Sequence, residues 1–340
     1  MCQLGRNTEL ASARPADLNS SMHHKPDIWA TLGPSSFTPE FFASVQDRVS
    51  LFRLNMSHMT VADMTARIQQ IRDHSAVPIC VDTEGAQIRT SVTESRQYRS
   101  GDSVVLSRAE LTPAEVWSQL RAQDHLAIGF DGLEIVITAV DDHRLTARCV
   151  QSGRLDNNKG VHCQTHTVDL PDLTAKDHMA IQRARSMGIN TFALSFTRDH
   201  RAIRSFQTLL PNCRLIYKIE TDSALQDLDR MFQTGTEFLI DRGDLGKSIG
   251  ADMVPIAQRQ IFHASRPYPA VRIAVATNFL ESMIDRPYAT RAEINDIYTA
   301  LEQGATSLIL AGETAIGRYP VECVSQVERM IALYCQQNTI

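Results

Sequence analysis

One pattern recurs along most of this 340-residue chain: a short apolar segment, a polar residue at its end, and an amphipathic stretch of helical length. Eight such apolar segments begin at residues 27, 50, 77, 190, 214, 236, 271 and 306. The amphipathic stretches predict helices over 38–46, 60–74, 174–187, 199–210, 223–233, 254–264, 290–303 and 319–336. Strands that alternate with helices form parallel sheets, and eight of them close a TIM barrel. We therefore predict an α/β fold in which 25–90 and 169–340 form a TIM (β/α)8 barrel.

The interval 91–168 breaks this rhythm. It contains short runs of alternating apolar and polar residues, joined by turn sequences, which predict strands over 102–108, 125–130, 133–140, 144–151 and 165–170. We expect a small β domain inserted after the third barrel strand. A loop that follows a barrel strand opens onto the barrel mouth, so this domain would act as a lid. An insertion without a role in the chemistry is the alternative.

Composition narrows the classes of function. The net charge is -5, aromatic residues make up 6%, and basic residues are dispersed, which argues against a nucleic-acid partner. No apolar run approaches the roughly 20 residues that span a bilayer, so we expect no membrane partner and a cytoplasmic protein. Residues 1–24 are polar and predict a flexible tail. The seven cysteines lie far apart, as reduced thiols do.

Charged residues gather at the ends of two successive apolar segments. One ends in Lys218 and Glu220, and the next ends in Arg242, Gly243 and Asp244. The C-terminal ends of barrel strands form the open mouth, and residues two apart on a strand face the same side. A lysine with two carboxylates there indicates metal-assisted chemistry on an anion. A surface salt bridge is the alternative for the first pair.

Short motifs, met in a fixed order, resemble those of the pyruvate kinase family from about residue 27 to the C-terminus. They include TLGPSS at 31–36, RLNMSH at 53–58, VDTEGAQIRT at 81–90, NKGV at 158–161, KIE at 218–220, RGDLG at 242–246, ATNFLESMI at 276–284 and AGETAIGRYP at 311–320. The resemblance implies transfer of the phosphoryl group of phosphoenolpyruvate to ADP, giving pyruvate and ATP.

The resemblance also implies ligands for two ions. Glu220 and Asp244 match the ligands of Mg²⁺ or Mn²⁺, an ion that few carboxylates suffice to hold because water and substrate oxygens complete its shell. The implied K⁺ ligands are Asn55, Ser57, Asp82 and Thr83. Capping of the following helix is the alternative for Asn55 and Ser57.

Catalytic and binding positions carry over in the same way. The catalytic set consists of Lys218, Arg53, Arg89, Thr277 and Glu313. In it the cations neutralise the phosphoryl group and the enolate, whereas Thr277 and Glu313 serve proton delivery. The substrate-binding set consists of Arg242, Gly243, Asp244, Thr277 and Ser195. The nucleotide-binding set consists of Pro34, Arg53, Asn55, His58 and Lys159.

Several positions depart from the family pattern, namely Glu84, Ala86, Gln87, Asp241, Asn278 and Ala311. Gln87 replaces a glutamate linked to K⁺ dependence, which argues against K⁺ activation. Asp241 stands where the family usually has alanine. It would serve as an extra metal ligand, raise the pKa of a neighbouring group, or form a salt bridge with a nearby arginine.

The sequence stops at Ile340, where family members typically continue into an allosteric domain. We therefore expect a form without that domain or its regulation, with a barrel-mediated homodimer as the expected assembly. Two other functions stay open. One is an Mg²⁺-dependent enzyme that acts on the pyruvate enolate in lyase or biosynthetic chemistry. The other is a binding or regulatory relative with little turnover.

Overall fold

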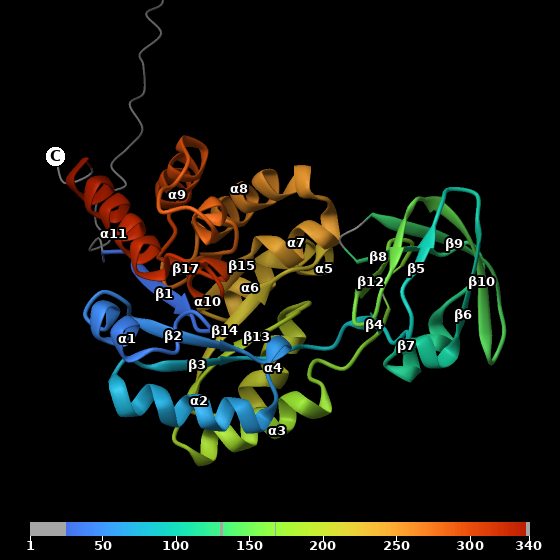
Figure 1. The fold of residues 1–340 in the computed structure, drawn as a ribbon, viewed down its shortest axis with the longest axis horizontal. Helices are drawn as coiled ribbons and strands as arrows, with labels where there is room; N and C mark the ends of the chain where they lie inside the picture. Colours follow the sequence, from blue (N-terminus) through green and yellow to red (C-terminus); the bar gives the residue numbers. More distant parts are fainter. Residues whose placement is uncertain (1–24, 130–131, 167, 338–340) are drawn as a thin grey trace, which may run out of the picture.

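The structure is a computed structural model that describes residues 25–129, 132–166 and 168–337. The tail predicted over 1–24 lies outside these residues. Figure 1 shows two parts, a ring of strands surrounded by helices and a separate antiparallel sheet beside one end of that ring.

The eight predicted barrel strands all form. They close a barrel in the order β1-β17-β16-β15-β14-β13-β3-β2, and each neighbouring pair is parallel. Their bounds are β1 (Asp27–Thr31), β2 (Leu51–Asn55), β3 (Ile79–Asp82), β13 (Thr191–Leu194), β14 (Arg214–Ile219), β15 (Glu237–Asp241), β16 (Arg272–Ala276) and β17 (Ser307–Leu310). The predicted TIM barrel is confirmed.

Helices cover the outside of the barrel (Figure 1). They are α1 (Pro39–Val45), α2 (Val61–His74), α3 (Ala175–Ser186), α4 (His200–Leu209), α5 (Asp222–Gln226), α6 (Leu228–Thr234), α7 (Arg242–Ile249), α8 (Val254–Ser265), α9 (Arg291–Gln303), α10 (Gly312–Ala315) and α11 (Pro320–Gln337). The single helix predicted over 223–233 is wrong, because the chain divides at Asp227. That carboxylate accepts a hydrogen bond from the backbone N–H of His200 at 2.8 Å, which ties the break to the start of α4.

Alternation along the strands divides the barrel interior into two layers. An apolar floor is built from inward-facing residues that include Trp29, Leu51, Cys80, Ile216 and Leu239. Side chains alternate along a strand, so the residues two positions further on point into the same interior. On β2, β3, β14 and β15 those residues are Arg53, Asp82, Lys218 and Asp241. A charged layer therefore lies directly above the apolar floor, at the C-terminal ends of the strands.

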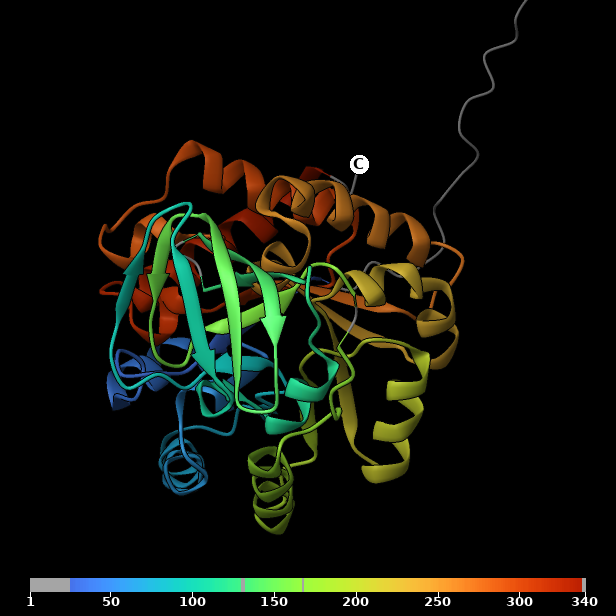
Figure 2. The same ribbon diagram turned by 90° about the vertical axis from the view of Figure 1, so that its right-hand side faces the viewer.

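The inserted part forms a seven-stranded sheet of order β6-β10-β9-β8-β12-β4-β7 and a two-stranded sheet of β11 and β5. It packs around its own core, and Figure 2 shows it in front of one end of the barrel. The bounds are β4 (Ile88–Thr90), β5 (Arg96–Tyr98), β6 (Ser103–Ser107), β7 (Leu111–Thr112), β8 (His125–Ile128), β9 (Leu133–Val140), β10 (Arg144–Gln151), β11 (Gly153–Leu155) and β12 (Gly160–Cys163).

The last strand predicted in this insertion is wrong. The described residues of 165–170 form no strand, and β12 pairs with β8 instead. Beyond β12, the Thr165 hydroxyl accepts the backbone N–H of His125 at 2.8 Å, so a side chain ends the ladder where the sequence suggested another strand.

Five short 3-10 helices complete the described chain, η1 (Met56–His58), η2 (Arg108–Glu110), η3 (Ala114–Gln119), η4 (Ala251–Met253) and η5 (Glu281–Ile284). Within the described ranges, no helix combines the length and the apolar character needed to cross a membrane.

Asp177 ties the start of the insertion to the barrel. It is fully buried and caps α3 in a capping box with Thr174. Its two carboxylate oxygens also accept the backbone N–H groups of Glu84 at 2.7 Å and Gly85 at 3.0 Å, just after β3. The Asp177 side chain thus provides the hydrogen-bond acceptors for the turn through which the chain leaves the barrel.

We predict that Asp177→Ala lowers the free energy of unfolding by about 3 kcal/mol, because several N–H groups lose their acceptor. Asp63→Ala is the matched control, since Asp63 forms the same capping box with Thr60 in α2 but is exposed. Urea denaturation should give a clearly smaller loss for the control. Equal losses would contradict the role of Asp177 at the junction.

Candidate active site

A cleft of about 1170 Å³ lies between the barrel mouth and the inserted sheet. The structure brings ten of the predicted site residues to its walls, namely Arg53, Asn55, Ser57, His58, Arg89, Lys159, Ser195, Lys218, Glu220 and Asp244. The barrel supplies most of them, whereas Arg89 on β4 and Lys159 before β12 come from the insertion. The cleft is therefore shared by the two parts of the molecule.

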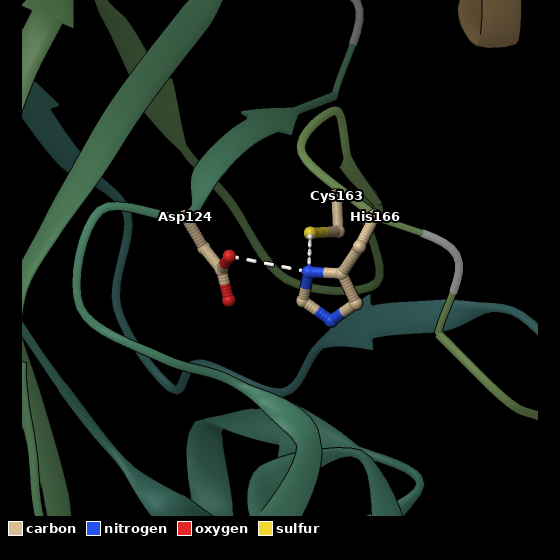
Figure 3. Close-up of side chains that lie close together, drawn as sticks. All are labelled: Asp124, Cys163 and His166. Carbon is tan, nitrogen blue, oxygen red and sulfur yellow. Dashed lines mark hydrogen bonds and ion pairs between the residues drawn. The ribbon is translucent and has the colours of Figure 1, made fainter.

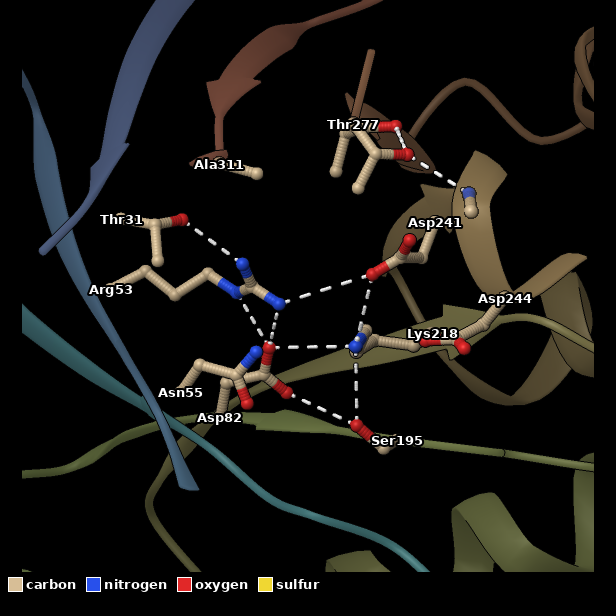
Figure 4. Close-up of polar contacts among 12 residues, drawn as sticks. Thr31, Arg53, Asn55, Asp82, Ser195, Lys218, Asp241, Asp244, Thr277 and Ala311 are labelled. Carbon is tan, nitrogen blue, oxygen red and sulfur yellow. Dashed lines mark hydrogen bonds and ion pairs between the residues drawn. The ribbon is translucent and has the colours of Figure 1, made fainter. Parts of the chain in front are cut away.

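The charged layer, with two cations and two carboxylates, forms the bottom of this cleft (Figure 4). Arg53 donates from Nε to Asp82 Oδ2 at 2.5 Å and from Nη1 to the Thr31 hydroxyl at 2.9 Å. Lys218 Nζ lies 3.4 Å from Asp82 Oδ2 and 3.2 Å from Asp241 Oδ2. Asp241 Oδ2 also lies 3.9 Å from Arg53 Nη2, so its carboxylate stands between both cations.

Because these charged side chains are buried, the pKa of a group here depends on the charges of its neighbours. Arg53, Lys218, Asp82 and Asp241 are each at most 4% exposed. Burial by itself lowers the pKa of Lys218, but Asp82, Glu220 and Asp241 raise it further, so its pKa ends above the ordinary value. Burial raises the pKa of Asp241, but Lys218 and Arg53 lower it more, so its pKa ends below the ordinary value. These interactions hold Arg53, Lys218 and Asp241 in their charged forms.

Glu220 differs from the other carboxylates, because part of its charge is uncompensated. Its Oε2 accepts the backbone N–H of Phe196 at 2.6 Å. Its Oε1 forms an ion pair with Lys218 Nζ at 2.7 Å and has no hydrogen-bond partner among the described residues. Burial, with Asp244 and Asp241 working against Lys218, raises the pKa of Glu220 to about 8.

This carboxylate has suitable neighbours for a divalent ion. Glu220, Asp241 and Asp244 each present a carboxylate oxygen, and these oxygens lie within 4.8 Å of one another. Arg53 and Lys218 face three buried carboxyl groups, those of Asp82, Asp241 and Glu220, and the raised pKa of Glu220 reflects a negative charge that the two cations do not fully offset. A bound divalent cation would favour ionised Glu220, and Mg²⁺ prefers oxygen ligands, so the residues present fit that ion.

The turn after β16 is strained and braced from α7. Thr277 and Asn278 have φ angles of +73° and +57°, which non-glycine residues rarely adopt. The Arg242 side chain turns away from the cleft to hold this turn, donating from Nε to the Thr277 carbonyl at 3.1 Å and pairing with Asp296. Gly243 N–H donates to the Thr277 hydroxyl at 2.9 Å. Because α7 begins at Arg242, its first N–H groups have no acceptor within the helix.

The remaining predicted residues lie behind the cleft or outside its walls. Thr83 is buried beneath Ser195, whose hydroxyl donates to the Thr83 carbonyl at 2.7 Å. Glu313 is buried and accepts the backbone N–H of Leu280 at 3.0 Å. Pro34 is exposed and is not among the lining residues. These positions stay predictions.

Two of the departures from the family pattern find partners. Glu84 forms an ion pair with Lys176 of α3 at 2.8 Å, so its partner lies outside the charged layer. The Asn278 amide donates to Glu281 at 2.8 Å. The Asn55 side chain accepts the Ser57 N–H at 3.0 Å. Asn55 therefore caps η1, which was the alternative to its role as an ion ligand.

Two residues that orient charged side chains at the bottom of the cleft were not identified from the sequence. Thr31 orients Arg53, and its place two residues after the inward-facing Trp29 is a signal that alternation provides. Phe196 orients Glu220 from a backbone with a φ angle of +53°. No local sequence pattern marks that conformation, because phenylalanine rarely adopts it.

We predict that Lys218→Met lowers the free energy of unfolding by about 3 kcal/mol, because it leaves buried carboxylates without their partner. Adding Asp241→Ala should restore part of the loss, since it removes one of those carboxylates. Lys159→Met, at the partly exposed cleft wall, is the control and should have little effect. Guanidinium denaturation of the parent, Lys218→Met, Asp241→Ala, the double variant and Lys159→Met provides the comparison. Strictly additive effects would contradict the coupling.

Comparison with known proteins agrees with this arrangement. A family model described as "Pyruvate kinase, barrel domain" matches residues 23–324. A pyruvate kinase of Methylorubrum extorquens is 31% identical over 321 residues, which cover 89% of this chain and 67% of that protein. Pyruvate kinases of Agrobacterium vitis and Aeropyrum pernix are 32% and 31% identical, over 91% and 89% of this chain and 68% and 69% of their own lengths. With a matched barrel that carries charged residues at its mouth, the chain belongs to the pyruvate kinase family.

Proposed function

We propose that this chain is an Mg²⁺-dependent phosphotransferase that moves the phosphoryl group of phosphoenolpyruvate to ADP. The observation that carries the proposal is the buried Lys218, which lies beside Arg53 and next to the carboxyl cluster of Glu220, Asp241 and Asp244. Phosphoryl transfer depends mainly on positioning the substrates and on neutralising their charge, and the charged layer supplies fixed charges for both tasks.

Glu220 and Asp244 would hold the divalent ion, which when bound neutralises charge on the substrate oxygens. Arg53 and Arg89 would bind the phosphoryl group through their forked donors. The Asp244 N–H, in the first turn of α7, would bind the substrate carboxylate, and the Gly243 N–H would exchange the Thr277 hydroxyl for it. Lys218 would neutralise the charge that develops on the enolate oxygen.

Proton delivery is proposed for the side of the cleft next to β16. The strained turn places Thr277 beside α7, and the buried Glu313 accepts backbone N–H groups of Ala311 and Leu280 behind it. Lys159 and His58, on facing walls of the cleft, would contact the nucleotide, with Ser195 and Asn55 completing the polar lining. The inserted sheet would close over both substrates and exclude water.

We infer little activation by K⁺. Asp82, an implied ligand of that ion, already has Arg53 and Lys218 on Oδ2 and accepts the Ser195 hydroxyl at Oδ1. A cytoplasmic location, expected from the cysteine pattern and the absence of a long apolar run, and a barrel-mediated homodimer, open from the family resemblance, remain proposals.

One observation favours a second function. Asp241 stands between Arg53 and Lys218, where a transferring phosphoryl group would meet a negative charge. An enzyme that acts on the pyruvate enolate without transferring a phosphoryl group would not face this conflict. Production of pyruvate from phosphoenolpyruvate only when ADP is present would separate the two functions.

We predict that Lys218→Met and Glu220→Ala each lower kcat by at least roughly 10²-fold, because each removes a charge that stabilises the transition state. A lactate-dehydrogenase-coupled assay with phosphoenolpyruvate, ADP and Mg²⁺ measures this. Glu237→Ala is the matched control, since Glu237 pairs with Arg214 at the opposite end of the barrel. Undiminished activity in either variant would exclude the mechanism, and an inactive parent would favour the other functions.

We predict that Asp241→Ala lowers the KM for phosphoenolpyruvate by about tenfold, because a negative charge is removed beside the two cations. Asp241→Asn should act in the same direction, since it removes the charge and preserves the shape. Steady-state kinetics at saturating Mg²⁺ provides the measurement. An unchanged KM with a higher Mg²⁺ requirement would instead make Asp241 a metal ligand.

A further inference from the structure

A second group of side chains that could bind a metal ion lies in the inserted part, separate from the carboxyl cluster at the barrel mouth (Figure 3). Asp124 precedes β8, Cys163 ends β12, and His166 lies in the segment that follows. The antiparallel pairing of β12 with β8 sets Cys163 opposite Leu126, which brings the three residues together. Among the described residues this is one of two clusters with ligand atoms within 4.8 Å of one another, and it alone contains sulfur.

The distances in this cluster match those around a tetrahedral metal ion. His166 Nδ1 lies 3.6 Å from Cys163 Sγ and 3.2 Å from Asp124 Oδ1. Zinc bonds of about 2.3 Å to sulfur and about 2.0 Å to nitrogen and oxygen give tetrahedral edges of about 3.5 Å for N···S and about 3.3 Å for N···O. Both distances at His166 therefore match such edges, and the ligand atoms of Cys163 and Asp124 lie within 4.8 Å of each other.

Hydrogen bonding accounts for the cluster less well. Both contacts meet at the same ring nitrogen, which offers either one proton or one lone pair. A nucleophilic Cys-His-Asp relay uses both ring nitrogens, one for the nucleophile and one for the carboxylate. Here Nε2 of His166 is buried and has no hydrogen-bond partner among the residues that the structure describes, and these residues therefore assemble no such relay.

We propose that Asp124, Cys163 and His166 bind one Zn²⁺ ion through Oδ1, Sγ and Nδ1, with a water molecule as the fourth ligand. Thiolate, imidazole and carboxylate together form a ligand set that zinc accepts and that Mg²⁺ does not prefer. Asp124 and Cys163 are 3% and 7% exposed, and Asp124 Oδ2 accepts the Arg121 N–H at 2.7 Å, which orients the carboxylate. Cys163 and His166 line the large cleft, so the fourth position is reached from there.

The ion would link two parts of the insertion. Asp124 lies before β8, whereas Cys163 and His166 belong to the segment that leads from β12 back to α3 in the barrel. Binding would fasten this segment against the sheet and stabilise the folded insertion through ligand linkage. The proposal does not depend on phosphoryl transfer and would hold for any chemistry in the barrel.

Cobalt provides the probe, because thiolate bound to Co²⁺ gives an intense charge-transfer band in the near ultraviolet. The metal-free full-length chain is saturated with Mg²⁺, which occupies oxygen sites, and is then titrated with Co²⁺. We expect the band to reach its maximum at one equivalent and to disappear when Zn²⁺ is added. The carboxylate cluster at the barrel mouth has no sulfur and cannot produce this band.

Variants assign the band to its ligands. Cys163→Ser should abolish it, and His166→Ala and Asp124→Asn should each weaken Co²⁺ binding by at least about tenfold. Cys149→Ala is the matched control and should retain the band, since Cys149 is buried in the same core but its thiol donates to the Gln151 carbonyl. Absence of the band in the parent, or its persistence in Cys163→Ser, would overturn the proposal.

A measurement on the unmodified chain covers the case in which a variant fails to fold. Zn²⁺ should slow alkylation of Cys163 by iodoacetamide at least about tenfold while Mg²⁺ should not, because a metal-bound thiolate is a poor nucleophile. Mass spectrometry of the digested protein reports the modification at each cysteine. Equal alkylation of Cys163 with and without Zn²⁺ would count against the site.

Discussion

The buried charge layer at the barrel mouth is the constraint on which the rest of the site depends. Arg53 and Lys218 are almost fully enclosed, and they remain charged because Asp82 and Asp241 lie against them. Removing any one member leaves a buried charge without its partner, which costs far more than a surface ion pair contributes. The layer therefore fixes its members in place, and it leaves Glu220 beside two further carboxyl groups, where burial and their charges raise its pKa.

The fold creates this layer through strand alternation. The inward-facing rows that fill the lower barrel with Leu51 and Ile216 reach the bottom of the cleft two residues later, at Arg53 and Lys218. The apolar floor excludes water from below, which strengthens the electrostatic interactions above it. The inserted sheet faces this layer across the cleft, so one wall of the site belongs to the barrel and the other to a separately packed body.

Much of this organisation follows from sequence pattern. Eight apolar segments with helical spacers predicted the barrel, and alternation within the segment ending in Lys218 and Glu220 predicted that both side chains face the mouth. The errors lie where a tertiary contact overrides a local pattern. Asp227 divides one predicted helix because it bonds to the start of α4, and Thr165 ends a ladder where another strand was predicted.

By itself, the sequence determined the repeating strands and helices, the two-residue register of the inward-facing rows and the family to which the chain belongs. These properties are encoded locally, in apolar periodicity and short motifs. Only the tertiary structure decided that Asp241 stands between Arg53 and Lys218, and that Cys163 and Asp124 meet at one nitrogen of His166. Distances among residues far apart in the chain depend on how strands close and pair, which no local pattern specifies.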